Sequence, residues 1–440
     1  MMKKNLVVIG GGESGLGASL LAKKNGWDVF LSDNGIIKDK SLLIKNNIDF
    51  EEQRHSLDRI LMADEIVKSP GIPDNIDLFQ KIRSKNIPVI SEIEFACRFT
   101  SAKIIAITGS NGKTTTTLLT HHILRNANLD VLIAGNIGFG LSKALLKKDY
   151  EYIVLELSSF QLDGIVDFKP FISILLNITP DHLDRYNNDF DQYVRSKLRI
   201  TLNQTENDFC IYNIDDDHIR SNLKTKAQCI PFSAHSLLIE ESVYYKEKQI
   251  NININNRKMK IQELALQGKH NLYNSMAAAV ASRVLEVKDF IIRQSLLDFK
   301  NIEHRLEYVL NVHGVDFVND SKATNVNATW YAIESMNKPV VWIAGGVNKG
   351  NDYNDLLLLA QEKVKSIVCL GSNNRDIHIT FKSSVESIVD AGSMMDAVQI
   401  SYDLADEGDV VLLSPSCASF DLFNNYEDRG IQFKKAVKKL

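Results

Sequence analysis

A glycine-rich loop followed by a lysine and four threonines is the stretch of this sequence best suited to chemistry. Residues 103–117 read KIIAITGSNGKTTTT, a pattern that predicts a buried strand, a tight turn and a helix. Gly109 and Gly112 let backbone N–H groups approach an anion where a Cβ would block them. Lys113 supplies a positive charge for β- and γ-phosphates, and the Thr114 hydroxyl suits Mg²⁺. The stretch therefore predicts a polyphosphate site.

The loop is a variant of the common motif G-x-x-x-x-G-K-[ST], because Ile107 occupies the first glycine position. A glycine turn that merely opens a helix would not require a lysine followed by threonines. Nucleotide binding accounts for both features.

A second glycine motif lies near the N-terminus. Gly10-x-Gly12-x-x-Gly15 separates a predicted strand from a predicted helix, and Asp33 follows the next strand. This is the dinucleotide-binding fingerprint in its proper context. The motif fits an NAD-dependent dehydrogenase. It also fits a protein that binds any other ligand whose diphosphate lies at the helix N-terminus and whose ribose hydroxyls meet Asp33.

Two polar residues follow predicted buried strands downstream of the phosphate loop. Glu156 ends one strand and His182 follows another, and both suit a divalent cation beside a polyphosphate, with Thr114 as a further ligand. A helix cap for Glu156 and a structural hydrogen bond for His182 are the alternatives. Lys197 shares a predicted helix with Tyr193, where most lysines would simply be solvated.

The composition limits the function classes. Apolar residues make up 44% of the 440 residues and charged residues 24%, as in soluble globular proteins. A net charge of −4 gives no basic surface for nucleic acid. We expect no membrane insertion, because the apolar runs are short, and no signal peptide. The five cysteines lack paired spacing, which indicates reduced thiols in the cytoplasm and argues against a disulfide framework or zinc site.

The order of predicted elements indicates an α/β protein of three domains. N- and C-terminal Rossmann-like parallel sheets flank a central P-loop ATPase domain. Within the central domain, the alternation across 243–266 predicts antiparallel strands. The expected boundaries are 1–96, 97–301 and 302–440.

Several runs, in order along nearly the whole chain, resemble the Mur ligases, which join amino acids to UDP-N-acetylmuramoyl precursors of peptidoglycan. They are ITGSNGKT (107–114), LELSSFQL (155–162), DHLDRY (181–186), SKLRI (196–200), HR (304–305), NDSKATN (319–325), GGVNKG (345–350) and SPSCASF (414–420). The runs SSFQ and DSKATN are similar to those of the members that add D-glutamate.

The resemblance implies a role for each matching residue. The catalytic group would be Lys113, Glu156, His182 and Lys197. The ATP site would comprise Gly109, Ser110, Asn111, Gly112, Lys113, Thr114, Thr115, Asn274, Arg305 and Asp320. The UDP substrate would meet Ser14, Gly15, Leu16, Asp33, Gly71, Asn136 and His182. D-Glutamate would meet Lys322, Thr324, Lys349, Ser419 and Phe420. The metal ligands would be Thr114, Glu156, His182 and Lys197 as a carbamate.

The implied activity is ATP-dependent addition of D-glutamate to UDP-N-acetylmuramoyl-L-alanine through an acyl phosphate, with one or two Mg²⁺ ions. The enzyme would be a cytoplasmic monomer that supplies cell-wall synthesis. Another Mur ligase or a folylpolyglutamate synthase is the nearest alternative. A nucleotide-operated switch would explain the phosphate loop but not three domains.

Overall fold

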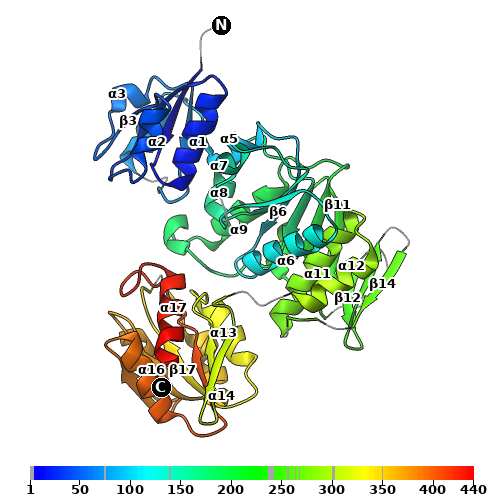
Figure 1. Ribbon diagram of the computed structural model, residues 1–440, viewed down its shortest axis with the longest axis vertical. Helices are drawn as coiled ribbons and strands as arrows, with labels where there is room; N and C mark the ends of the chain where they lie inside the picture. Colours follow the sequence, from blue (N-terminus) through cyan, green and yellow to red (C-terminus); the bar gives the residue numbers. More distant parts are fainter. Residues whose placement is uncertain are drawn as a thin grey trace. The chain divides into compact units, whose positions relative to one another are not determined.

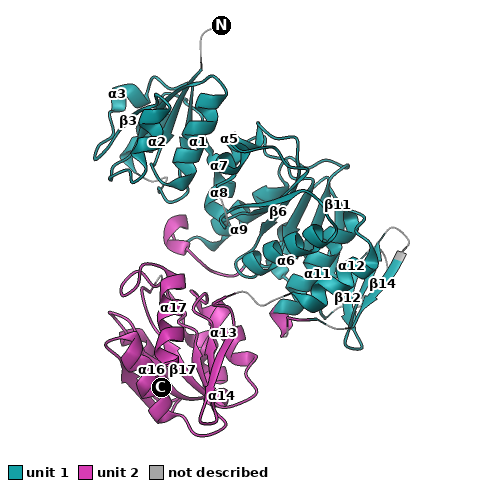
Figure 2. Ribbon diagram, in the orientation of Figure 1, with its two compact units in different colours: residues 1–178, 189–264, 271–299 teal, residues 179–188, 265–270, 300–440 magenta. Residues whose placement is uncertain are grey.

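The computed structural model describes residues 4–73, 76–137, 140–235, 242–254, 257–262, 264–266, 268–299, 303–348 and 350–440. In this part of the chain, sheets of five, nine and six strands follow one another along the sequence, each packed with helices (Figure 1). This confirms a three-domain α/β architecture. The chain divides into two compact units (Figure 2). Unit 1 comprises residues 1–178, 189–264 and 271–299, and unit 2 comprises 179–188, 265–270 and 300–440.

The first sheet is entirely parallel, in the order β3-β2-β1-β4-β5. Its strands are β1 (Asn5–Ile9), β2 (Asp28–Ser32), β3 (Asp49–Glu51), β4 (Glu65–Lys68) and β5 (Val89–Ser91). Its helices are α1 (Glu13–Lys24), α2 (Lys40–Lys45), α3 (Leu57–Ile60), α4 (Asp77–Ser84) and α5 (Glu92–Cys97). The predicted strand, glycine turn and helix at the N-terminus are confirmed.

The central sheet has the order β14-β13-β12-β11-β10-β9-β6-β8-β7. Its strands are β6 (Lys103–Thr108), β7 (Val131–Gly135), β8 (Tyr152–Glu156), β9 (Ile172–Leu175), β10 (Phe209–Asn213), β11 (Gln228–Ser233), β12 (Ser242–Lys246), β13 (Gln249–Ile254) and β14 (Arg257–Ile261). The strands β12 to β14 pair antiparallel, as predicted, and β12 joins them in parallel to β11. They extend the parallel sheet rather than forming a separate one.

The helices around the central sheet place the phosphate loop. They are α6 (Lys113–Asn126), α7 (Leu141–Leu145), α8 (Ser159–Asp163), α9 (Phe190–Leu198), α10 (Asp217–Asn222), α11 (Lys269–Val284) and α12 (Asp289–Asp298), with the 3₁₀ turns η1 (Leu183–Tyr186) and η2 (Arg199–Thr201). Figure 1 shows α6, α11 and α12 side by side. The loop before α6 leaves the carboxyl end of β6, where open α/β sheets bind ligands.

Two buried carboxylates join the first sheet to the central domain within unit 1. Glu94 on α5 accepts hydrogen bonds from the backbone N–H groups of residues 166–168 at 2.8–3.1 Å. Glu92 accepts one from the Ser142 N–H at 2.5 Å, and burial raises its pKa. Because each carboxylate receives backbone donors from across the junction, the junction is held by specific polar contacts as well as by packing.

The third sheet lies in unit 2 and has the order β15-β16-β20-β17-β18-β19. Its strands are β15 (Glu307–Val312), β16 (Val315–Asn319), β17 (Val340–Ala344), β18 (Val364–Cys369), β19 (Ser387–Asp390) and β20 (Val410–Leu413). Its helices are α13 (Val326–Glu334), α14 (Leu357–Lys363), α15 (Arg375–Phe381), α16 (Met394–Leu404) and α17 (Tyr426–Val437), with η3 (Asn354–Leu356). Only the edge pair β15 and β16 is antiparallel among its described strands.

Strand β17 shows how this third sheet is buried on both faces. Trp342 and its alternate neighbours enter one hydrophobic core, and Val341 and Ile343 enter the other. A continuous apolar run is therefore needed, and this is the pattern that made the strand predictable. None of the helices that the structure describes is long and apolar enough to cross a membrane.

Candidate active site

The phosphate loop has the predicted form: β6 ends at Thr108 and α6 begins at Lys113. Gly112 caps the helix with φ +82°, and a Cβ there would lie 2.3 Å from Asn274 Oδ1. The Lys113 ammonium donates to the carbonyls of Gly109 and Ser110, at 2.8 Å each. The loop thus forms a narrow backbone cradle, with a cation at the start of a fourteen-residue helix whose N-terminus favours anions.

Lys197 lies against the same loop and is almost completely buried, with 2% of its surface exposed. Its Nζ donates to the Gly109 carbonyl at 2.8 Å and lies 4.7 Å from the centre of the Tyr193 ring. The Tyr193 hydroxyl is 3.0 Å from Ser110 Oγ. Lys197 is therefore not an ordinary solvated lysine, because α9 packs it against the loop, and its role as a carbamate and metal ligand stays a prediction.

Glu156 ends β8 and is 1% exposed. Its Oε1 accepts a hydrogen bond from Asn136 Nδ2 at 2.8 Å. Its Oε2 is buried and has no hydrogen-bond partner among the residues that the structure describes. A buried carboxylate oxygen without a partner is costly, so this atom fits the ligand set of a cation. Asn136, predicted for the UDP substrate, and Glu156, predicted for metal, therefore adjoin.

Two asparagines support the loop from neighbouring elements. Asn177, which follows β9, accepts from the Asn111 N–H at 2.8 Å and donates to the Asn111 carbonyl at 3.1 Å. Asn274 on α11 accepts from Thr116 Oγ1 at 3.2 Å. Asn274 was predicted for ATP, whereas Asn177 was not assigned a role. Its position directly after a buried strand was the available signal.

The N-terminal glycine loop holds its predicted residues at the carboxyl edge of the first sheet. A Cβ on Gly15 would lie 1.8 Å from the Gly10 carbonyl, so only glycine fits there. Asp33 accepts hydrogen bonds from the N–H groups of Gly11 and Gly35. Ser14, Gly15 and Leu16 form the first turn of α1. The exposed Gly71 follows β4 at the same edge.

In unit 2, Asp320 follows β16 and is 2% exposed. It accepts from the Leu306 N–H at 3.2 Å and from Ser414 Oγ at 3.1 Å. Burial raises the pKa of Asp320 to about 6, although the positive charge of Arg305 acts in the opposite direction. Arg305, also predicted for ATP, is thus close enough to influence this carboxyl group.

The described residues among those predicted for D-glutamate lie on two loops of unit 2. Lys322 donates to the Tyr426 hydroxyl at 3.4 Å, and Thr324 is half-buried. Ser419 is buried and Phe420 is 73% exposed. Lys349 lies outside the described residues, so its predicted role is untouched by the structure.

Arg429 joins these two loops and was missed by sequence reasoning. It is 1% exposed, and its guanidinium donates to Ser321 Oγ, to the Ser321 carbonyl and to the Cys417 carbonyl at 2.8–3.1 Å. Burial lowers its pKa to about 10. Nothing in the sequence distinguishes this arginine from a surface residue in the first turn of a helix.

His182 belongs to unit 2, in the short segment 179–188. It has φ +55°, and its Nε2 is 3.8 Å from Asp181 Oδ2. Asp181 in turn accepts from Asn325 Nδ2 at 3.2 Å. A shared site of His182 with Glu156 of unit 1 stays a prediction.

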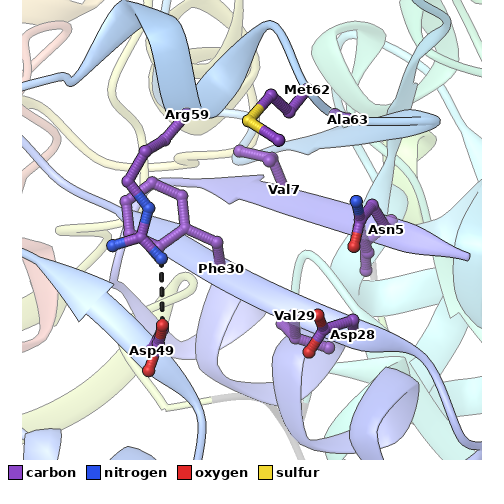
Figure 3. A pocket seen from close by; sticks show the side chains of 10 residues that line it. Asn5, Val7, Asp28, Val29, Phe30, Asp49, Arg59, Met62 and Ala63 are labelled. Atoms are coloured by element: carbon purple, nitrogen blue, oxygen red, sulfur yellow. Dashed lines mark hydrogen bonds and ion pairs between the residues drawn. The ribbon is translucent and has the colours of Figure 1, made fainter. Parts of the chain in front are cut away.

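A small hollow of about 180 Å³ lies at the opposite, amino edge of the first sheet (Figure 3). Arg59 stacks on Phe30, 3.7 Å from the ring centre, and forms an ion pair with Asp49 at 3.0 Å. None of the residues predicted to bind a ligand lines this hollow. Its arginine is already paired, and we assign it no role in the chemistry.

The strand–loop–helix cradle and the three sheets define a multidomain α/β protein of the phosphate-loop class. Family models match in the same order: the MurD N-terminal domain over 3–77, the Mur ligase middle domain over 107–282, and the Mur ligase glutamate ligase domain over 304–417. The chain belongs to the Mur ligase family, which is ATP-dependent.

Curated relatives match over their whole length. The chain is 52% identical to a UDP-N-acetylmuramoylalanine--D-glutamate ligase of Christiangramia forsetii, covering 100% of both chains. It is 48% identical to that of Porphyromonas gingivalis over 100% of this chain and 99% of the relative. Among solved structures, a pseudomurein peptide ligase of Methanothermus fervidus has a TM-score of 0.63 at 19% identity, over 99% and 100% of the chains. A MurF ligase of Thermotoga maritima in complex with ADP has a TM-score of 0.60 at 18% identity, over 87% and 91%. These two likenesses concern the fold.

Proposed function

We propose that this chain is the ATP-dependent ligase that adds D-glutamate to UDP-N-acetylmuramoyl-L-alanine. The observation that carries the proposal is sequence identity of 52% and 48%, over the full length, to two relatives named as D-glutamate ligases of this kind. The phosphate loop and the buried Glu156 supply the groups that such a reaction needs. The product would enter peptidoglycan synthesis in the cytoplasm.

The reaction requires the substrate carboxylate to be activated before an amine can attack it. ATP would transfer its γ-phosphoryl group to a carboxylate oxygen, giving an acyl phosphate and ADP. The amine of D-glutamate would then attack the acyl carbon, and phosphate would leave as the amide forms. Lys113 and the N–H groups of residues 109–115 would stabilise the negative charge of the transferring phosphoryl group.

The residues present fit a Mg²⁺ ion beside the phosphates. Glu156 Oε2, which has no hydrogen-bond partner in the described part of the chain, and the Thr114 hydroxyl are hard oxygen donors. His182 would complete the set from unit 2. When bound, Mg²⁺ would neutralise phosphate charge and fix the orientation of the γ-phosphate.

Lys197 would act as a carbamate. Its Nζ is buried beside the Gly109 carbonyl, on the loop that would hold the phosphates. An ammonium there would oppose a metal ion, whereas a carbamate offers two anionic oxygens. Only a neutral amine reacts with CO₂, and burial together with nearby cations favours the neutral form.

The remaining predicted residues divide between the two substrates. The UDP moiety would bind along Ser14, Gly15, Leu16, Asp33, Gly71 and Asn136, and the adenine nucleotide would extend to Asn274, Arg305 and Asp320. D-Glutamate would bind to Lys322, Thr324, Lys349, Ser419 and Phe420. The domains would be 1–96, 97–301 and 302–440, in a monomer whose state sedimentation can check.

An amino-acid panel tests the activity. The full chain is incubated with UDP-N-acetylmuramoyl-L-alanine, ATP and Mg²⁺, and phosphate release is followed with one amino acid at a time. We expect D-glutamate to exceed L-glutamate by at least about 10²-fold, because fixing both carboxylates leaves the amine one direction of approach. Equal rates, or a preference for a diamino acid, would reassign the substrate within the family.

Carbon-13 NMR tests the carbamate separately. Protein equilibrated with ¹³C-bicarbonate, nucleotide and Mg²⁺ should show a carbamate carbonyl signal that is absent from Lys197→Ala. Lys148→Ala, at an exposed lysine paired with Asp130, is the control and should retain the signal. A wild-type spectrum without the signal leaves Lys197 as a plain cation.

A further inference from the structure

Three potential metal ligands meet at the carboxyl edge of the third sheet, and none of them is assigned to the ligase reaction. Cys369 is the last residue of β18 and Asp390 the last of β19. The register of these parallel strands pairs Cys369 directly with Asp390. His378 lies on α15, the helix that connects the two strands. The fold thus brings together a thiol, an imidazole and a carboxylate that are spread over about twenty positions of the sequence.

The distances are close to those of a metal site. One ligand atom from each residue lies within 4.8 Å of the other two. His378 Nε2 is already 3.0 Å from Asp390 Oδ2. In a tetrahedral Zn²⁺ site with bonds of about 2.0–2.3 Å, neighbouring ligand atoms are roughly 3.3–3.6 Å apart. The cluster therefore needs a contraction of up to about 1 Å toward Cys369, which rotamer adjustments of the solvent-accessible His378 and Asp390 side chains can supply.

The surroundings orient the groups. Asn374 Nδ2 donates to Asp390 Oδ1 at 2.8 Å, which leaves Oδ2 directed at the histidine. The same amide donates to the Gly371 carbonyl at 3.2 Å, so the carboxylate is tied to the loop after β18. Cys369 is fully buried and forms the floor of the cluster, whereas His378 and Asp390 are reached from solvent. Outer hydrogen bonds of this kind are what hold ligating carboxylates in place.

We propose that Cys369, His378 and Asp390 bind a divalent transition metal of the zinc type, with water at the fourth position. One sulfur, one nitrogen and one oxygen donor suit Zn²⁺ or Co²⁺ and disfavour Mg²⁺, which requires oxygen ligands. The site uses no residue of the proposed ligase chemistry and stands or falls independently of it. The spacing of the cysteines along the sequence argued against such a site, because it takes no account of the strand pairing that brings Cys369 beside Asp390.

Metal binding here must release a proton. Burial, with a contribution from the Asp390 charge, raises the pKa of the Cys369 thiol to about 12. The thiol is therefore protonated at neutral pH, and the metal has to displace that proton to form the thiolate bond.

Cobalt titration of the full chain tests the proposal. Co²⁺ is added with Mg²⁺ in large excess, so that the oxygen-rich site by Glu156 is occupied by Mg²⁺. We expect one equivalent of Co²⁺ to produce a near-ultraviolet thiolate-to-cobalt absorption band, displaced by Zn²⁺. Cys369→Ser should abolish the band, and His378→Gln should weaken Co²⁺ binding at least about tenfold. His378 is half-exposed, so its variant stays informative if Cys369→Ser fails to fold.

Two matched controls use the chain itself. Cys210 and Cys229 are register partners on β10 and β11, and they form the rival sulfur site. His122 and Asp298 form a histidine–carboxylate pair at 2.9 Å on other helices. Cys229→Ser and His122→Gln should leave the band unchanged. A wild-type protein without the band, a band that survives Cys369→Ser, or one that disappears in Cys229→Ser would overturn the proposal.

Discussion

Unit 1 contains two glycine loops that share a strand–turn–helix conformation but have side chains of opposite charge, Asp33 at the first loop and Lys113 at the second. Each leaves the carboxyl end of a central parallel strand and opens a helix, at Glu13 in one case and at Lys113 in the other. In the first loop the acceptor is a carboxylate, because Asp33 receives the N–H groups of Gly11 and Gly35. In the second loop the backbone carbonyl of Gly109 is the acceptor, and Nζ of Lys113 and Nζ of Lys197 both donate to it.

This difference between the two loops shows that the backbone conformation alone does not determine which ligand a loop binds. Both helix N-termini favour an anion, but the side chains set how much negative charge each loop accepts. A loop that already holds a carboxylate suits a ligand with hydroxyl donors and a diphosphate, which carries less negative charge than a triphosphate. A loop with the Lys113 ammonium and a buried carboxylate nearby suits a triphosphate with its metal ion.

The largest effect should follow removal of the charge in the second loop. Lys113→Ala should lower turnover about 10²–10³-fold, because it removes a preorganised cation from the transferring phosphoryl group. The fold should persist, since the ammonium contacts loop carbonyls rather than the core. Phosphate release measures the loss, and Lys148→Ala serves as the control. Near-normal turnover in Lys113→Ala would remove the second loop from the chemistry.

Glu156→Gln should separate stability from catalysis. The amide keeps the size of the side chain and can retain the hydrogen bond from Asn136, but it removes a buried negative charge. We expect turnover to fall about 10²-fold and the Mg²⁺-dependent rise in Tm with ADP to disappear, while the metal-free protein becomes no less stable. Thermal unfolding with and without Mg²⁺ is the measurement. Glu151→Gln, at the exposed start of the same strand region, should behave as wild type.

The first loop can be broken sterically. Gly15→Ala places a Cβ 1.8 Å from the Gly10 carbonyl, and this backbone cannot yield cheaply. We expect a loss of about 1–3 kcal/mol in the free energy of unfolding, as for other overpacked sites. A Cβ on Gly12 would meet nothing within 4 Å, so Gly12→Ala is the matched control in denaturant unfolding. Equal stability of the two variants would contradict the close helix–strand packing.

The smallest effect should come from Asp33→Asn. The side chain loses its charge and keeps an oxygen for only one of the two N–H groups, because Gly11 donates to Asp33 Oδ2 and Gly35 donates to Asp33 Oδ1. A weakened hydrogen bond to a charged group is worth about 1.5 kcal/mol, so the KM for the UDP substrate should rise roughly tenfold. The KM for ATP should not change, because that substrate uses the other loop. Asp28→Asn, at the opposite end of β2, is the control, and an effect on ATP alone would refute the assignment of the two loops.

Local sequence patterns were enough to predict many of the individual strands, turns and helices of this protein. Alternation and apolar runs predicted most strands, and the glycine, lysine and threonine pattern predicted the phosphate loop with its helix. Both depend on neighbours within about ten residues, because strand burial and turn geometry are local requirements. Five short strands were not predicted: β3, β7, β10, β11 and β19. They are stabilised mainly by pairing with partners distant in sequence.

The contacts between side chains that are distant in sequence depend on the tertiary structure. Lys197 contacts the Gly109 carbonyl across 88 positions of sequence, and Arg429 joins Ser321 to Cys417. Cys369 faces Asp390 only because β18 and β19 pair in one register, and a slip of one residue would turn one of them to the other face. Such contacts depend on strand order and packing, which no local pattern encodes. The sequence therefore indicated which single residues could take part in chemistry, whereas the fold determines which other residues they contact.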